Sequence, residues 1–212
     1  AAMSHDEPLI LVTDHKISAV EPIMPILEMA ARESRPLIFI AEEIEGQALA
    51  AMIMNAMRGT LKIAAIKAPF YGEERRDLLQ DVALSTGAKF ITRESGAKLN
   101  EVVLAHLGSA KSIECSKYFT TIVGGDCDFE AIETKIQSLK TQIEQTESMD
   151  ECERIQGRVV RLSSGVAVIR VGGSTEVEMT ERKHRIEDAL EAVKSALDEG
   201  IVPGGGVSLL RA

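Results

Sequence analysis

The 212-residue chain is 45% hydrophobic but only 3% aromatic and has no Trp, so any core that it forms is aliphatic. Its formal net charge of -9 disfavours nucleic acid and anionic lipid as main partners, because like charges repel. No apolar run approaches the roughly 18 residues of a membrane-spanning helix, and the cysteines and histidines lack the spacing of a disulfide framework or a metal site.

Strands and helices are expected to alternate over the first ninety residues. Short apolar runs predict strands, and runs with helical periodicity predict helices. The expected strands are residues 8–13, 36–41, 61–66 and 88–92, and the expected helices are residues 19–34, 45–58 and 74–86. Gly59 and Gly87 follow two of these helices, as is typical of C-terminal caps. The alternation predicts an α/β fold with a mainly parallel sheet.

The remaining residues follow a different pattern. Two neighbouring strands, a charged helical hairpin, one further strand and a final amphipathic helix are expected at residues 110–116, 118–123, 128–148, 150–162, 166–171 and 180–199. The glycine run Gly204–Gly206 then leads into an apolar stretch that stops at Ala212. That stretch would lack packing partners in a chain ending there, so we expect the sequence to be part of a longer protein.

The helices at residues 19–34 and 45–58 carry more apolar residues than a helix needs to cover a sheet. A core-facing stripe accounts for part of each helix, and Met24, Ala31, Ala50 and Met54 widen it. Five of the eight methionines lie in these two helices, and methionine is over-used at binding surfaces that accept varied partners. Deep burial of both helices is the alternative explanation, since such stripes usually belong to a core.

Eight segments occur together in a set order and spacing. They are IAEEIEGQAL from Ile40, NAMRG from Asn55, KAP from Lys67, LLQD from Leu78, SGVAVIRVG from Ser164, TEVEM from Thr175, RIEDAL from Arg185 and EGIVPGGG from Glu199. This series resembles the group I chaperonins, the bacterial 60 kDa family, from about residue 8 to the end of the chain. The resemblance implies an apical polypeptide-binding domain at residues 1–166, part of the intermediate domain at 167–199 and the start of the equatorial ATP-binding domain at 200–212.

The resemblance also implies a binding groove between the two apolar helices. In this family the apical groove binds non-native polypeptides and then the 10 kDa co-chaperonin. The matching positions here are Met24, Leu27, Leu49, Ile53 and Met54, with Asn55 beside them. The rest of each stripe, including Ile23, Met52 and Met57, is expected in the core. An apolar groove would capture a non-native chain through the hydrophobic effect, and a heptameric ring of identical subunits would multiply the affinity.

For the intact protein the resemblance implies an ATPase that uses ATP and magnesium. Asp188 matches the family's catalytic aspartate, which activates water, and Gly205 matches a nucleotide-contacting glycine. Glu176 matches a position that forms a salt bridge between apical and intermediate elements. Taken alone, Asp188 looks like a solvated acid on an amphipathic helix, and the glycine run looks like a turn. The family's Gly-Asp-Gly-Thr-Thr phosphate loop is absent, so this chain alone is expected to lack ATPase activity.

Two departures from the family pattern stand out. The family usually has Gly-Phe-Gly after Lys-Ala-Pro, whereas this chain has Phe70-Tyr71-Gly72, and its groove is richer in Met. Both are compatible with a divergent paralogue that has other clients or another co-chaperonin. A purely structural oligomerisation domain with both helices buried is a second alternative. An independent nucleotide-binding protein is disfavoured, because neither GxGxxG nor GxxxxGK[ST] occurs. The resemblance implies a bacterial cytoplasmic location or, alternatively, an organelle matrix.

Overall fold

The computed structural model describes residues 3–116, 119–163, 169 and 171–211. The chain divides into two compact units, Ala1–Val166 and Ala167–Ala212. The division falls where the sequence predicts the end of an apical domain, and the identity of each unit as a chaperonin domain stays a prediction. The α/β fold class is confirmed, since helices and a mixed sheet make up the first unit.

The first unit contains a mixed sheet whose parallel part was predicted. The strands β2 (Leu9–Val12), β4 (Leu37–Ala41) and β6 (Ile63–Lys67) are neighbours and run parallel. Leu9 pairs with Leu37, which in turn pairs with Ile63, so the three strands are in register. Each is a short apolar run followed by a helix, which is the pattern of a strand-helix-strand crossover.

The other half of the sheet is antiparallel. The strand β7 (Gly108–Cys115) pairs with β2, with β1 (Met3–Asp6) and with β8 (Thr120–Gly125), and all three pairings are antiparallel. The hairpin of β7 and β8 confirms the two neighbouring strands expected after residue 110. The sheet order is therefore β1-β7-β2-β4-β6, with β8 beside β7, and the expectation of a mainly parallel sheet is correct only for β2, β4 and β6.

The strand predicted at residues 88–92 is wrong. Only one isolated parallel bridge forms there, between Thr13 and Ile91, with the Thr13 hydroxyl donating to the Ile91 carbonyl at 2.8 Å. The reason is competition for the same edge of β2, because β7 already pairs with Leu9 and Ile10. The two-residue strands β3 (Lys16–Ile17) and β5 (Glu43–Ile44) pair with each other and are too short to produce a sequence signal.

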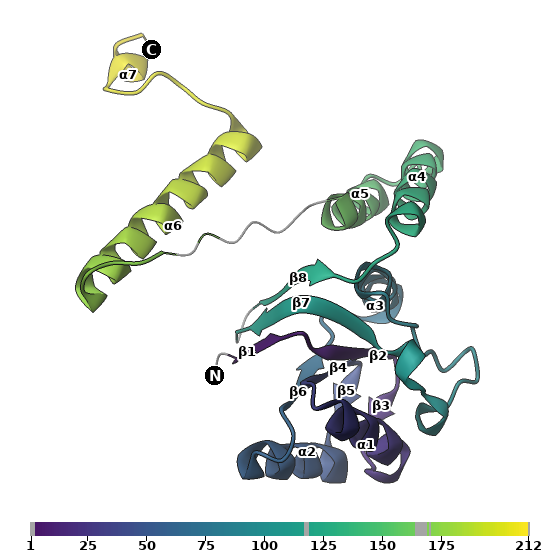
Figure 1. The fold of residues 1–212 in the computed structure, drawn as a ribbon. Helices are drawn as coiled ribbons and strands as arrows, with labels where there is room; N and C mark the ends of the chain where they lie inside the picture. The colour runs from purple at the N-terminus through teal and green to yellow at the C-terminus, as the bar shows by residue number, and fades with distance from the viewer. Residues whose placement is uncertain (1–2, 117–118, 164–168, 170, 212) are drawn as a thin grey trace. The chain divides into compact units, whose positions relative to one another are not determined.

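Successive residues of the central strands point to opposite faces of the sheet, as the pleat requires. One face carries Leu9, Leu11, Leu37 and Phe39, which pack with α1 (Met24–Glu33) and α2 (Gly46–Arg58). The other face carries Ile10, Val12, Ile38 and Ile40, which pack with α3 (Gly72–Thr86). Figure 1 shows α1 and α2 on one side of the sheet and α3 on the other. Strands buried on both faces read as continuous apolar runs, which is why they were recognisable.

The ends of these helices follow the expected chemistry. Gly59 ends α2 at φ 67 and Gly87 ends α3 at φ 70, both in the left-handed region that glycine tolerates best. At Gly87 a Cβ would lie 2.1 Å from the Asp126 carbonyl oxygen, so no larger residue fits. Pro22 and Pro25 lie in the first turns of a short 3-10 helix (Glu21–Ile23) and of α1, where a missing N–H costs little.

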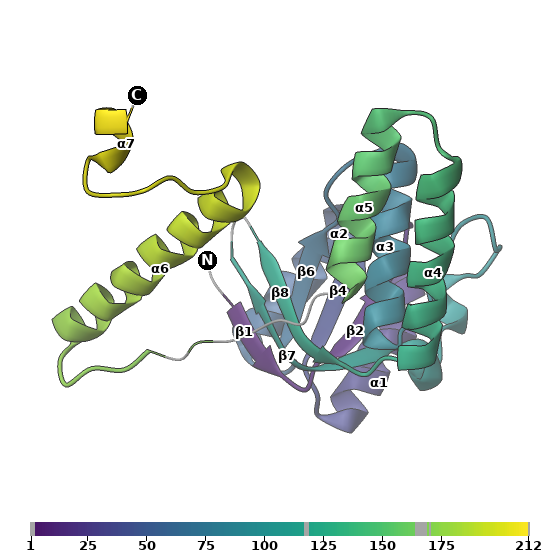
Figure 2. The same ribbon diagram turned by 90° about the horizontal axis from the view of Figure 1, so that it is seen from above.

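A helical hairpin forms a second layer over α3. The helices α4 (Phe129–Gln145) and α5 (Met149–Ser163) pack against each other and against α3, as Figure 2 shows from above. Asp128 caps α4, because its side chain accepts a hydrogen bond from the Glu130 N–H at 3.0 Å. Leu139 and Ile155 are the buried apolar residues of the pair. The predicted hairpin is therefore confirmed.

The second unit contains the long helix α6 (Glu176–Glu199) and the short helix α7 (Val207–Arg211). The helix α6 begins four residues earlier than the sequence indicated, because the side chains of Thr175 and Glu178 cap its N-terminus. The Thr175 hydroxyl accepts from the Glu178 N–H at 3.2 Å, and the Glu178 carboxylate accepts from the Ser174 N–H at 2.8 Å. Of the strand predicted at residues 166–171, residues 166–168 and 170 lie outside the described residues.

Candidate functional site: an exposed apolar helix face

The helix α2 presents an apolar surface to solvent. Its buried residues are Ala48 and Met52, which contact the sheet and α1 residues of the same core. At about 100° per residue, Ala50, Ile53, Met54 and Met57 fall within an arc of roughly 100° on the opposite side of the helix. All four are exposed, and the fractions reach 50% for Ile53, 50% for Met54 and 82% for Met57. We call these four residues the apolar face of α2.

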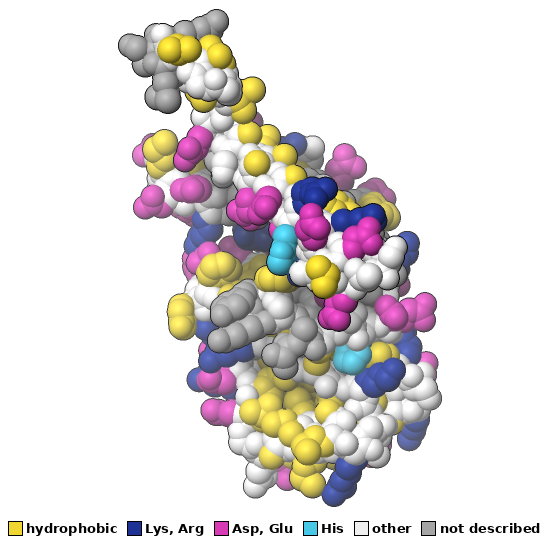
Figure 3. Space-filling model, turned by 90° about the vertical axis from the view of Figure 1, so that its left-hand side faces the viewer, with side chains coloured by type: hydrophobic (Ala, Val, Ile, Leu, Met, Phe, Trp, Pro, Cys, Tyr) yellow, Lys and Arg dark blue, Asp and Glu magenta, His cyan; other side chains and the backbone are white. Residues whose placement is uncertain are grey.

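The position of the apolar face of α2 shows that it is not simply the edge of a wide core-facing stripe. A wide stripe would leave its extra apolar residues at the flanks and a polar residue at the outer pole. Here Ala50 and Met57 occupy the outer pole, and the polar residues Gln47 and Arg58 stand at one flank. Figure 3 shows hydrophobic side chains gathered at the lower end of that view, where α2 lies. Contiguous exposed apolar surface of this kind marks interaction sites.

Five of the six residues predicted for the groove are at least partly accessible. Met24 on α1 is 44% exposed, Ile53 and Met54 are half exposed, and Leu49 and Asn55 are half-buried. The Asn55 amide donates to the Ala51 carbonyl at 2.9 Å, so this donor is satisfied within the helix.

The sixth residue, Leu27, is 8% exposed and packs in the core with Ile26 and Ala30, and its role in binding stays a prediction. The core prediction for Met57 is wrong, because Met57 is 82% exposed. The physical reason is that a helix buries only the side that meets the sheet, and periodicity does not say which side that is. Ile23 and Met52 are in the core, as predicted.

On the opposite face of the sheet, ion pairs as well as apolar packing hold the covering helices together. Arg158 of α5 is 5% exposed, and its Nε and Nη2 donate to the two Asp81 carboxylate oxygens at 2.8 and 2.9 Å. Its Nη1 lies 2.9 Å from Asp77 Oδ2. Burial alone would lower the pKa of Arg158, but the hydrogen bonds and charges of Asp81 and Asp77 outweigh it and raise that pKa above its ordinary value. This cluster links α3 to the helical hairpin.

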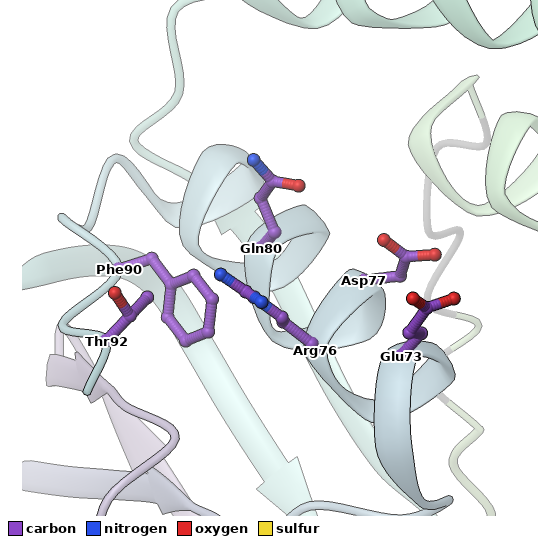
Figure 4. A pocket seen from close by; sticks show the side chains of 6 residues that line it. All are labelled: Glu73, Arg76, Asp77, Gln80, Phe90 and Thr92. Atoms are coloured by element: carbon purple, nitrogen blue, oxygen red, sulfur yellow. The ribbon is translucent and has the colours of Figure 1, made fainter. Parts of the chain in front are cut away.

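A hollow of about 480 Å³ lies beside α3, away from every predicted site residue. Figure 4 shows its lining side chains, four of which come from α3 and two from the segment after it. Two of its charged residues are already paired, since Arg76 binds Glu94 and Asp77 binds Arg158. These pairs leave few charged groups for a ligand, so the apolar face is the better candidate.

Arg75 contacts the loop Phe70-Tyr71-Gly72, which departs from the family pattern, and holds it in place. Phe70 has φ 64, a left-handed value that is unfavourable for a residue with a side chain. The Arg75 Nε donates to the Phe70 carbonyl at 2.8 Å, its Nη1 lies 2.9 Å from Glu42 Oε1, and its guanidinium lies 5.1 Å from the centre of the Tyr71 ring. Phe70 and Tyr71 are 43% and 84% exposed.

The two residues predicted for ATP chemistry, Asp188 and Gly205, lie in the second unit, as does the predicted salt-bridge residue Glu176. Asp188 is exposed on α6, and Glu176 is exposed in the first turn of that helix. Gly205 has φ 66, and nothing lies within 4 Å of the position that a Cβ would take. Among the described residues no group of three or more His, Cys, Asp or Glu side chains could hold a metal ion. Nor, within the same residues, is any helix long and apolar enough to cross a membrane.

One comparison with known proteins bears on these observations. A family model described as the TCP-1/cpn60 chaperonin family matches residues 17–212 of the chain. The match covers α1, α2 and their exposed apolar residues, and it extends through both units to the last residue.

Proposed function

The chain belongs to the TCP-1/cpn60 chaperonin family, and from that premise we propose that the apolar face of α2 captures non-native polypeptides. Membership of the family supports a general role in protein folding. The proposal adds the place of capture, and it assigns residues 1–166 to an apical domain of the group I type.

The single observation that carries the proposal is the apolar outer pole of α2. A non-native chain exposes apolar side chains in no fixed pattern, and an apolar surface binds them through the hydrophobic effect at roughly 25 cal/mol per Å² buried. Ile53, Met54 and Met57 supply such surface on a helix that the sheet holds in place. The flexible methionine side chains adapt to partners of different shape. Met24 on α1 adds accessible apolar surface on the same side of the sheet.

The group I assignment brings further partners into the proposal. The same face would bind the 10 kDa co-chaperonin after releasing the client, and heptameric rings would present seven such faces to one client. We propose a bacterial cytoplasmic location or an organelle matrix on the same ground. The alternative of a structural oligomerisation domain would bury both helices in the assembly, and exposure of α2 in the folded oligomer would exclude it.

ATP hydrolysis by the intact protein is proposed for Asp188 and Gly205. Hydrolysis of bound ATP would supply the free energy for the folding cycle, and a magnesium ion would neutralise charge on the phosphates. The open space at Gly205 would let a nucleotide approach the backbone closely, and an exposed carboxylate such as Asp188 can accept a hydrogen bond from the attacking water. The Gly-Asp-Gly-Thr-Thr loop does not occur in these 212 residues, so we propose that they do not hydrolyse ATP alone.

A binding experiment tests the capture of polypeptides. The probe is reduced and carboxymethylated lactalbumin, a permanently unfolded chain, and native lactalbumin is the matched negative ligand. We expect roughly micromolar binding of the unfolded form alone, since one helix face buries a modest apolar area. Met54→Glu should weaken it at least about tenfold, because a charge then faces an apolar ligand. Gln137→Glu adds the same charge on exposed α4 and should leave binding unchanged. Equal losses in both variants would refute the assignment.

A second experiment tests Asp188 in a full-length chain that includes the phosphate loop. Asp188→Ala should keep nucleotide affinity and lose steady-state hydrolysis by about 100- to 10,000-fold, as expected of a group that acts only in the transition state. Normal hydrolysis by this variant would mean that Asp188 is an ordinary solvated acid on the helix surface. Loss of ATP binding together with hydrolysis would point to a structural or metal-positioning role instead.

A further inference from the structure

Two of the four residues on the apolar face of α2 are methionines, whose side chains can be oxidised. Met54 and Met57 are 50% and 82% exposed on it, and Met24 of α1 is 44% exposed on the same side of the sheet. Met52 lies on the same helix, is 3% exposed and packs in the core. Oxidants in solution therefore reach the thioethers of the face while the structural methionine beneath them is protected.

We propose that Met24, Met54 and Met57 form a modification site at which peroxides or hypochlorous acid switch off polypeptide binding. The inference rests on the proposed function, because it describes the regulation of the same surface. Aliphatic residues at these three positions would provide equal apolar area without this chemistry. The methionines thus make the binding surface sensitive to two-electron oxidants.

The reaction is a transfer of one oxygen atom to each sulfur. The sulfur lone pair attacks one oxygen of hydrogen peroxide, the O–O bond breaks and an S–O bond forms. The sulfur is oxidised by two electrons, and the departing hydroxide takes a proton to become water. With hypochlorous acid the O–Cl bond breaks, and the products are the sulfoxide, chloride and a proton. The side chain keeps its length but gains a strong dipole and a hydrogen-bond acceptor.

The consequence for binding follows from desolvation. An apolar ligand that covers a sulfoxide must strip water from a polar oxygen without offering a hydrogen bond in return. Met52 is buried in the core and stays reduced, whereas Met3 and Met29 are partly buried against the core, so their oxidation is mapped as well. Oxidation should therefore abolish capture without unfolding the protein, and reduction of the sulfoxides by the two methionine sulfoxide reductases, which differ in the epimer they accept, should restore it.

Two other sets of oxidisable residues provide controls within the chain. Met149 and Met179 are 88% and 41% exposed, and neither lies on α1 or α2. They should be oxidised as readily but without effect on binding. Cys115, Cys127 and Cys152 are free and partly accessible, so peroxide will also reach them. Treatment with dithiothreitol after oxidation reverses disulfides and sulfenic acids but leaves methionine sulfoxide in place, which separates the two chemistries.

The experiment treats the 212-residue chain with hydrogen peroxide, then with dithiothreitol, and maps the sulfoxides by mass spectrometry. Binding of carboxymethylated lactalbumin and thermal unfolding are measured before and after. We expect sulfoxide at Met24, Met54 and Met57 but not at Met52, an unchanged melting transition and binding at least about tenfold weaker.

The affinity of the triple variant Met24→Leu, Met54→Leu, Met57→Leu is measured before and after oxidation, and oxidation should not change it, whatever its starting value. The variant Met149→Leu, Met179→Leu should remain sensitive to oxidation. The proposal is overturned if the triple variant loses affinity on oxidation as the parent does, if dithiothreitol alone restores binding, or if the oxidised parent binds normally. If the untreated parent does not bind lactalbumin, the proposed capture function fails first, and the two failures are distinguished.

Discussion

The two faces of the central sheet are covered to different depths. On one face α3 packs on the strands and is itself covered by α4 and α5, with Arg158 buried between them. On the other face α2 packs on the strands through Ala48 and Met52 and leaves Ile53, Met54 and Met57 in solvent. Further helices therefore cover the helix on one face of the sheet only. The apolar face of α2 is therefore accessible to a ligand, whereas α3 contributes to the stability of the fold.

A substitution on the covered face of the sheet should cost the most stability. Arg158→Met removes the cation and leaves the Asp81 carboxylate buried without its partner, so the free energy of unfolding should fall by about 3–5 kcal/mol. Denaturant unfolding measures the loss. The double variant Arg158→Met, Asp81→Leu removes both charges and should recover much of the stability. If the single variant loses less than about 1 kcal/mol, the hairpin is not held by this cluster.

The next effect tests the inner side of α2. Met52→Ala should lower the free energy of unfolding by about 2–5 kcal/mol, because it opens a cavity in the core that contains Phe39 and Ile26. Met57→Ala makes the same chemical change on the exposed side of the same helix and should stay within about 0.5 kcal/mol of the parent. Similar losses in the two variants would mean that Met57 is covered and that the apolar face does not exist as described.

Much of this fold could be predicted from the sequence, and the failures share a cause. The strands β2, β4 and β6 are short apolar runs, and glycines cap the helices α2 and α3 that follow β4 and β6, so their signals are local. Whether residues 88–92 become a strand depends on which segment pairs with β2 first, and β7, which follows in the sequence, takes that edge. No local pattern reports such competition.

The candidate site, too, could be predicted from the sequence only in part. The apolar surplus of α2 was visible in its composition, and the family resemblance indicated a binding role for Ile53 and Met54. The side of α2 that meets the sheet was not visible in the sequence, so Met57 was expected in the core and is exposed. The pairing of Arg158 with Asp81 joins residues 77 positions apart and carried no signal in the sequence.

A smaller effect is expected where the two helices begin. The first residue of α2 is Gly46, which has φ 60. Phe70 lies two residues before Gly72, the first residue of α3, and Phe70 has φ 64. Phe70→Gly should raise the free energy of unfolding by at most about 1 kcal/mol, since relief of the left-handed strain exceeds the entropy gained by the unfolded chain. Tyr71→Gly is the matched control and should destabilise, because Tyr71 has an ordinary φ of -142 and stacks on Arg75. A loss of stability in Phe70→Gly would contradict this account of the loop.

The central claim is that α2 has an outer surface built for binding and an inner surface built for stability. Ile53→Glu tests it most directly, since Ile53 follows the buried Met52 in the chain and is itself 50% exposed. Thermal unfolding and the affinity for carboxymethylated lactalbumin are measured on the same preparation. We expect a change in unfolding free energy below about 1 kcal/mol and binding at least about tenfold weaker. Loss of the cooperative melting transition would place Ile53 in the core, and unchanged binding would remove the apolar face of α2 as the site of capture.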